Sequence, residues 1–253
     1  LDHDGDPATL EPFVTGMVGG VPEVWNLPPA AGDIDHDGDV EIILTGPQGI
    51  WAFEADATGV RDIASGAVGW YQSLPWCDLP PILLPVDFPE NGEPTGFVSV
   101  CVVVTANGRT YLQFFSGPNA DPGTEISLGE VWVPATPVLA DEFLLTAVAD
   151  TSGQNHHLLV RDLTPSSVPE EPVQLEVPLT REPGIFPVSW GLVPGTDPAD
   201  PVYFAIVIDA FGHGETVYFD DSLRKAQDNV VWDEGVVVRS PLATGGAFVG
   251  DDI

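Results

Sequence analysis

The chain has 253 residues, a length that suits one large all-β domain or two small ones. It carries 39 acidic and only 7 basic residues, which gives a formal charge of −32 at pH 7. This charge repels nucleic acids and anionic membrane surfaces, so it argues against both as partners, and it fits surroundings rich in salt or divalent cations. Because 43% of the residues are hydrophobic, we expect a folded protein. No apolar run reaches the roughly 18 residues of a membrane span, so we expect no membrane insertion.

The chain begins within an acidic motif, LDHDGD, in which Asp2, Asp4 and Asp6 alternate around Gly5. No signal peptide precedes this motif, and we therefore expect that an N-terminal part of the natural protein is missing from the sequence. Residues 8–27 follow, and they are predicted to form the first and faintest of several β-hairpins.

Residues 32–46, GDIDHDGDVEIILTG, combine an acidic loop with an apolar run. A hard cation such as Ca²⁺ takes oxygen ligands from alternate side chains, a backbone carbonyl and a closing carboxylate, with a glycine at the sharp turn. The loop offers this pattern around Gly38. The candidate calcium ligands are Asp33, Asp35, Asp37, Asp39 (through its main-chain oxygen) and Glu41. Without a cation, these alternating carboxylates would repel one another at close range.

The residues after this loop argue against an EF-hand. Counted from Asp33, position 12 of an EF-hand loop is a bidentate Glu that precedes a helix, whereas here this position is Leu44. The run EIILTG at 41–46 is rich in β-branched residues and ends at Gly-Pro, which predicts a strand. The alternative to metal binding is a solvated turn, because Asp and Gly are common turn residues.

The strongest organisational signal is a hairpin that recurs along the chain. Each copy has an apolar strand, a small Gly or Asn turn and a second strand rich in aromatic residues. The hairpins are predicted at 8–27, 41–56, 97–117, 142–163 and 202–221. Pro-flanked apolar segments precede them at 27–33, 79–87, 134–141 and 186–195. Further strand-like segments follow at 68–75, 173–179 and 230–238, and residues 220–229 hold one short helical turn at most.

About four strands recur in each unit of about 50 residues, which is the arrangement of a β-propeller blade. We therefore predict an all-β fold, a single β-propeller domain over residues 1–253 built of about five four-stranded repeats. The repeats are predicted near 1–27, 28–78, 79–133, 134–185 and 186–240, with 241–253 as a closing or next-blade strand.

The acidic loop, the strand IILTG and the following strand GIWAFEAD resemble the FG-GAP/VCBS repeats, which build integrin-α-like β-propellers and occur in many bacterial surface proteins. In that family the Asp-rich loop binds Ca²⁺ on one face of the ring, so the resemblance implies the same role for the five candidate ligands. It implies a weaker second site at Asp2, Asp4 and Asp6, where the ninth position is Ala8.

The other units depart from the family pattern, because their loops at 87–96, 139–142 and 194–201 lack alternating carboxylates. We expect these units to keep the β scaffold without the metal. Residues 241–253 resemble the lead strand and loop entry of a further unit. Either they close the first blade and complete a five-bladed ring, or the chain is part of a larger, seven-bladed propeller.

Catalytic chemistry has little support in the sequence, which has no nucleophile elbow, zinc-protease helix or phosphate-binding loop. His156 and His157 are adjacent, so on a strand they face opposite sides and cannot bind one metal together. His213 is interpreted as a solvated turn residue. The tryptophans are predicted to pack between blades rather than to stack on sugars; they are Trp51, Trp70, Trp76, Trp132, Trp190 and Trp232.

Two cysteines, Cys77 and Cys101, leave two interpretations open. They form a disulfide if the protein is secreted, or they are small buried hydrophobic residues.

The sequence therefore predicts a Ca²⁺-stabilised β-propeller of an extracellular or cell-surface protein, which serves recognition or adhesion without catalysis. Its expected partner is a protein or glycan at the cell surface, or the flanking domains of a larger chain. The alternative is a carbohydrate-binding or carbohydrate-active propeller, either a lectin or a polysaccharide-cleaving enzyme, in which carboxylates and Trp faces would converge in one pocket. A third possibility is a purely structural repeat module of a surface assembly.

Overall fold

A computed structural model describes a set of ranges along the chain. They are residues 17–18, 21–22, 27–34, 40–46, 49–54, 70–74, 77–84, 99–116, 121–140, 143–152, 154–163, 174–193, 202–219 and 226–232. The chain divides into two compact units, residues 1–129 and 130–253. The described residues contain strands and turns without a helix, so none of them forms a helix long and apolar enough to cross a membrane. The predicted all-β class is confirmed.

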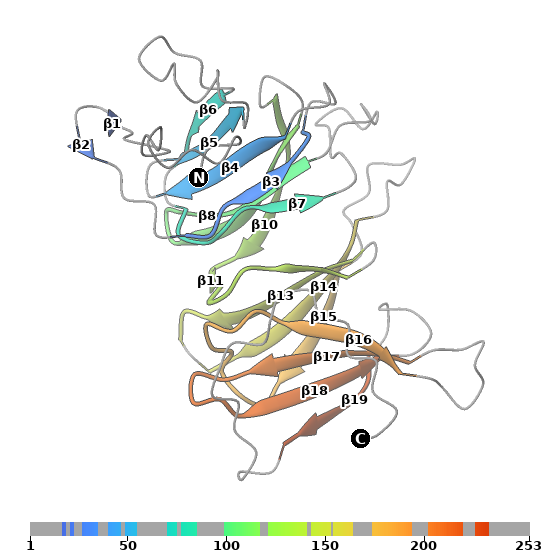
Figure 1. The fold of residues 1–253 in the computed structure, drawn as a ribbon. Coiled ribbons are helices and arrows are strands. Elements are labelled where there is room, and N and C mark those ends of the chain that lie inside the picture. Colours follow the sequence, from blue (N-terminus) through green and yellow to red (C-terminus); the bar gives the residue numbers. More distant parts are fainter. Residues whose placement is uncertain are drawn as a thin grey trace. The chain divides into compact units, whose positions relative to one another are not determined.

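The first unit contains two four-stranded antiparallel sheets, in each of which consecutive strands are neighbours (Figure 1). The first sheet consists of β3 (Ala30–Gly32), β4 (Glu41–Gly46), β5 (Gly49–Glu54) and β6 (Trp70–Ser73). The second consists of β7 (Ile82–Leu84), β8 (Ser99–Ala106), β9 (Arg109–Ser116) and β10 (Asp121–Gly129). A two-stranded pair, β1 (Met17–Val18) and β2 (Val21–Pro22), is described within the predicted first hairpin.

The second unit repeats this arrangement. Its first sheet consists of β11 (Val131–Trp132), β12 (Val138–Ala140), β13 (Phe143–Asp150), β14 (His156–Asp162) and β15 (Gln174–Leu179), where β11 and β12 both pair with β13. Its second sheet consists of β16 (Ser189–Val193), β17 (Val202–Ile208), β18 (Gly214–Phe219) and β19 (Ala226–Val231).

The four hairpins predicted from residue 41 onward are confirmed, and so are the Pro-flanked strands that precede them. The turn between β8 and β9 shows why the sequence forms a hairpin at this position. Asn107 and Gly108 both have positive φ, at 52° and 76°, as the tight turn that matches the twist of paired strands requires. Asn and Gly adopt this conformation most readily, so the dipeptide sets the register of the hairpin.

Two strands differ from the sequence prediction. The sequence analysis expected about four strands in the repeat near 79–133 but gave no range for the last one, which is β10, an edge strand with register shifts around Pro122 and Gly129. The edge position tolerates Pro because one side of the strand needs no partner. In the last sheet β19 begins at Ala226, four residues before the predicted strand-like segment 230–238, and it includes the end of the segment 220–229, for which at most one short turn was predicted.

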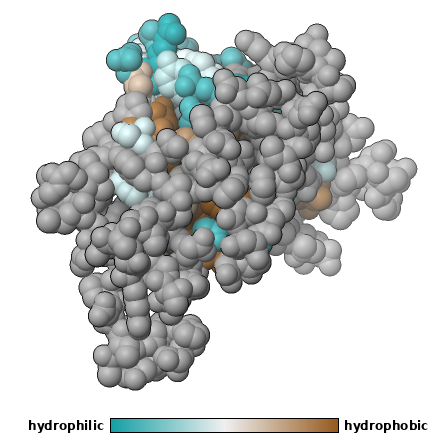
Figure 2. All heavy atoms as spheres, turned by 90° about the horizontal axis from the view of Figure 1, so that it is seen from above, coloured by the Kyte–Doolittle hydropathy of each residue, from teal (hydrophilic) through white to brown (hydrophobic). Residues whose placement is uncertain are grey.

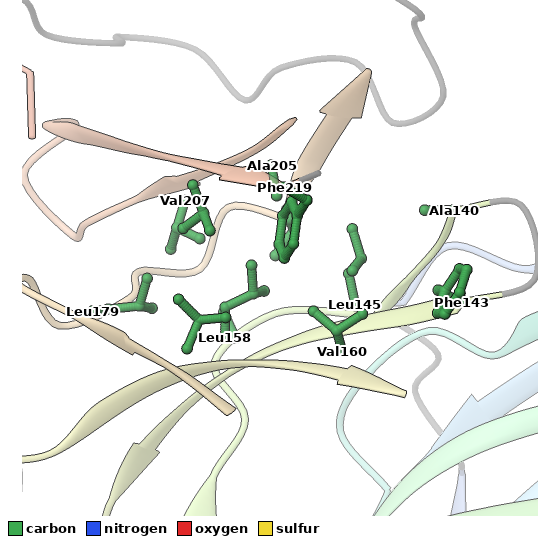
Figure 3. Packing of buried hydrophobic residues seen from close by; sticks show 13 residues of the cluster. Ala140, Phe143, Leu145, Leu158, Val160, Leu179, Ala205, Val207 and Phe219 are labelled. Atoms are coloured by element: carbon green, nitrogen blue, oxygen red, sulfur yellow. The ribbon is translucent and has the colours of Figure 1, made fainter. Parts of the chain in front are cut away.

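Each unit has its own hydrophobic core. In unit 1, apolar side chains of β4 and β5 pack against alternate residues of β8, among them Val100, Val102 and Val104. In unit 2, side chains of β13–β15 pack against those of β17 and β18 (Figure 3), with Phe219 and Leu158 fully buried. Among the described residues on the face drawn in Figure 2, hydrophobic residues show only as small areas.

The central strands of two sheets are buried on both faces. Residues 100–104 of β8 and 143–149 of β13 are buried without alternation. Successive side chains of a strand point to opposite faces, so the sheets that contain these strands are covered on both sides. This explains the continuous apolar runs VCVVV and FLLTAVA in the sequence.

The two cysteines are both free and buried, so the disulfide interpretation is wrong. Cys77 packs in the core of unit 1 with Val100 and Val102, whereas Cys101 lies between these two valines on β8 and therefore points to the opposite face. Burial, with a smaller contribution from Asp78, raises the pKa of the Cys77 thiol to about 12. Burial also raises the pKa of Cys101.

Candidate functional site

The acidic loop connects the first two strands of the first sheet. Gly32, the last residue of β3, is the register partner of Glu41, the first residue of β4. Asp33 follows β3 directly, so the first and last candidate ligands lie at the two ends of the loop where neighbouring strands hold them close together. The hairpin geometry therefore brings these two carboxylates to one end of the sheet.

Glu41 closes this loop through a hydrogen bond. The backbone N–H of Ile34 donates to Glu41 Oε2 at 2.7 Å, and Glu41 is only 2% exposed. Ile34 itself is buried in the core of unit 1, which fixes the beginning of the loop. The atoms Asp33 Oδ1 and Glu41 Oε1 are also buried. Buried carboxylate oxygens require hydrogen bonds or positive charge nearby, and carboxylate oxygens are ligands that suit a hard cation.

The remaining candidate ligands, Asp35, Asp37 and Asp39, lie outside the described residues, and so does the weaker second site at Asp2, Asp4 and Asp6. Within the described ranges no group of three or more His, Cys, Asp or Glu side chains is arranged to hold a metal ion. The described part of the predicted site therefore consists of Asp33 and Glu41, and the predicted calcium ligation stays a prediction.

A second cluster of polar side chains surrounds Asp209 in unit 2, at the turn between β17 and β18. Asp209 is 7% exposed, and its Oδ1 accepts hydrogen bonds from the backbone N–H groups of Phe211 and His213, both at 2.8 Å. Its Oδ2 lies 3.1 Å from His213 Nδ1 and 3.4 Å from an Arg181 guanidinium nitrogen. Burial alone would raise the pKa of Asp209, but the donors of His213 and Phe211 outweigh it and hold the pKa below its usual value.

Glu215 forms a neighbouring buried contact. It is 1% exposed and accepts hydrogen bonds from Thr180 N at 2.8 Å and Thr180 Oγ1 at 3.3 Å. Asn229 Nδ2 donates to the same carboxylate at 3.1 Å and to Pro178 O at 2.8 Å. Glu215 and Asn229 thus tie the end of β15 to strands β18 and β19 of the next sheet.

The turn between β13 and β14 uses an aspartate in the same way. Asp150, the last residue of β13, accepts hydrogen bonds from Ser152 Oγ, Gln154 N and Asn155 Nδ2. The bond from Ser152, helped by those from Asn155 and Gln154, holds the pKa of Asp150 well below its usual range. An Asp at the end of a strand, followed by Gly, Ser or Asn, is the sequence signal that would have predicted both structured turns.

The predictions for the histidines and tryptophans agree with the structure only in part. His156 and His157 lie on β14, as expected. His213 lies in a turn, as predicted, but it contacts Asp209 and its side chain is 24% exposed, so it is only partly solvated. Trp51 is buried and Trp190 packs against the core of unit 2, whereas packing of tryptophans between blades stays a prediction. Trp232 donates from Nε1 to Thr216 Oγ1, and Trp132 is 49% exposed; the side chains of Trp70 and Trp76 lie outside the described residues.

Comparison of the chain with protein-family models and with curated proteins found no match. The class of the protein is therefore described by its fold. It is an all-β chain of repeated antiparallel sheets, with an acidic loop between the first two strands of one sheet.

Proposed function

We propose that the chain is a calcium-stabilised β-propeller, which acts as a recognition, adhesion or structural module of an extracellular surface protein and carries out no catalysis. The repeated sheets support this proposal, because each is an antiparallel meander of the kind that forms a propeller blade. Burial of β8 and β13 on both faces also supports it, since a blade is covered by a neighbour on each side.

The observation that carries the calcium proposal is the buried contact between Glu41 and the backbone of Ile34, beside Asp33. It joins the two ends of the acidic loop, where Asp33 and Glu41 lie. Asp33, Asp35, Asp37 and Glu41 would hold the cation with their side chains, and Asp39 would add its main-chain oxygen.

The cation would neutralise the negative charge of this loop and thereby stabilise the folded state, because an ion that binds only the folded chain shifts the equilibrium toward it. The loop lies at the end of a sheet whose strands are fixed by the core of unit 1. A neutralised and rigid loop at this end would present a defined surface to a protein or glycan partner.

The test is a calcium titration of the whole chain, with melting temperature and bound-metal stoichiometry measured with and without chelator, at low and high NaCl. We expect bound Ca²⁺ and a raised melting temperature, both reduced by Asp35→Asn. Asp78→Asn is the matched control, because Asp78 is an exposed carboxylate of the same unit that lies outside the loop.

Two results would contradict the proposal. One is a melting temperature that follows NaCl alone and does not respond to Ca²⁺. The other is equal calcium binding by Asp35→Asn and Asp78→Asn, which would show that the general acidity of the surface attracts the ion.

A further inference from the structure

The linker between β15 and β16 is fastened to the turn between β17 and β18. Pro183 forms an isolated antiparallel bridge with Asp209, and Gly184 N donates to Ile208 O at 2.8 Å. The contact is close, because a Cβ on Gly184 would lie 2.7 Å from the backbone of Asp209 and Ala210. Only glycine fits here without displacing one of the two segments.

Side chains of both segments meet at the carboxylate of Asp209. His213 reaches it from the turn and Arg181 reaches it from the linker, at 3.1 Å and 3.4 Å from the same oxygen. The other oxygen accepts two backbone N–H groups of the turn. One buried carboxylate therefore organises the turn and holds the linker.

We propose that Asp209, His213 and Arg181 form a proton-sensitive latch between linker residues 180–184 and the β17–β18 turn, and that protonation of His213 tightens it. Histidine is the side chain whose ordinary titration falls between about pH 5 and 8. When its ring is neutral, the contact with Asp209 is a hydrogen bond to a carboxylate; when the ring is protonated, a full ion pair is added, and such bonds are shorter and stronger.

The charged groups at this contact come from two segments. Asp209 lies in the same turn as His213, Arg181 reaches the same carboxylate from the linker, Glu182 is the next residue of the linker, and Glu215 follows the turn on β18. Arg181 opposes protonation, but its contact with Asp209 is longer and its side chain is 29% exposed, so solvent screens it.

The latch also controls how one aromatic ring is presented. Phe211 is 79% exposed at the tip of the turn, while its backbone N–H donates to Asp209. Its ring lies 6.5 Å from the ring of His213, measured between centroids. A tightened latch holds this exposed ring in one position, whereas a loosened latch releases both the turn and the linker.

The experiment compares hydrogen exchange of peptides covering 209–213 and 180–184 at about pH 5 and about pH 8, with each rate corrected for the intrinsic rate of the unfolded peptide. In the wild type we expect the protection of both segments to be roughly tenfold higher at the lower pH. This factor is the change in an equilibrium constant expected when one neutral hydrogen bond becomes a charge-assisted one. His213→Gln is expected to lose this difference, and His157→Gln, a histidine of β14 in the same unit, is expected to keep it.

Arg181→Gln separates the two arms of the latch. Because the guanidinium stays charged over this range, its loss should lower the protection of 180–184 by a similar factor at both pH values and leave the pH dependence at 209–213. Equal pH dependence in the wild type and in His213→Gln would overturn the proposal, as would protection in the wild type that does not change with pH.

Discussion

Ile34 and Glu41 are seven residues apart, and the backbone N–H of the first donates to the buried carboxylate of the second at 2.7 Å. This bond spans the acidic loop at its base. It therefore joins a residue near the start of the loop to the residue at its end.

Removal of the Glu41 side chain is expected to destabilise unit 1. Glu41→Ala should lower the free energy of unfolding by about 2 kcal/mol, because the buried N–H of Ile34 loses its charged acceptor. Glu41→Gln keeps an acceptor oxygen and should cost less, yet it removes the charge and should weaken the response of the melting temperature to Ca²⁺. Urea denaturation of both variants measures this; equal losses would show that the hydrogen bond is not what Glu41 contributes.

Glu215 is expected to be as important for unit 2. Glu215→Ala leaves Thr180 N–H without its acceptor, and we expect a loss of about 2 kcal/mol in the free energy of unfolding. Thr180→Val removes only the longer hydroxyl contact and keeps the backbone donor, so a loss below about 0.5 kcal/mol is expected. A larger effect of Thr180→Val than of Glu215→Ala would contradict this assignment.

Gly108 and Gly184 allow two costs of an alanine substitution to be compared, one from backbone conformation and one from packing. Gly108 has φ of 76° with open space around its Cα, so Gly108→Ala should cost about 1 kcal/mol from conformation alone. Gly184→Ala, at an ordinary φ, places its methyl group against the backbone of Asp209 and should cost more. Thermal unfolding of the two variants gives the order, and the reverse order would show that the linker moves aside easily.

The low pKa of Asp209 predicts a specific loss of stability in acid. Its folded pKa lies below that of the unfolded chain, near 4, so its contribution is fully present above this pH and is lost as the pH falls through the folded value. The difference in melting temperature between wild type and Asp209→Asn should therefore shrink below about pH 4. Asp78→Asn, at an exposed carboxylate, serves as the control; a difference that persists at low pH would contradict the prediction.

Both thiols are expected to resist alkylation in the folded protein. Their raised pKa values keep them protonated at pH near 8, and only the thiolate reacts. Iodoacetamide should label neither Cys77 nor Cys101 before unfolding, and both after it, as mass spectrometry of the intact chain would show. Rapid labelling of Cys77 in the native protein would indicate that its core opens locally.

Much of the fold could be predicted from the sequence, because hairpins are local. The runs EIILTG and VCVVVTA and the Asn107-Gly108 turn specify strands and register within a few residues of one another. The strands that the sequence placed least well are edge strands: β10, with its Pro122, was given no range, and β19, with its polar residues, begins at Ala226 and not at 230. An edge strand needs fewer apolar side chains and fewer backbone partners, so its composition carries a weaker signal.

In the candidate site, too, contacts between residues close in the sequence could be predicted, and contacts between distant residues could not. Its acidic loop is a contiguous pattern, so the sequence by itself determined the all-β class and the recurring hairpins and predicted which residues would ligate a cation. Only the tertiary structure decided that Arg181 and Asp209, or Thr180 and Glu215, would meet, because these pairs are separated by 28 and 35 residues. It also decided that Cys77 and Cys101 are free, buried thiols. Contacts of this kind depend on how one sheet packs against the next, and the periodicity of a single strand carries no information about that packing.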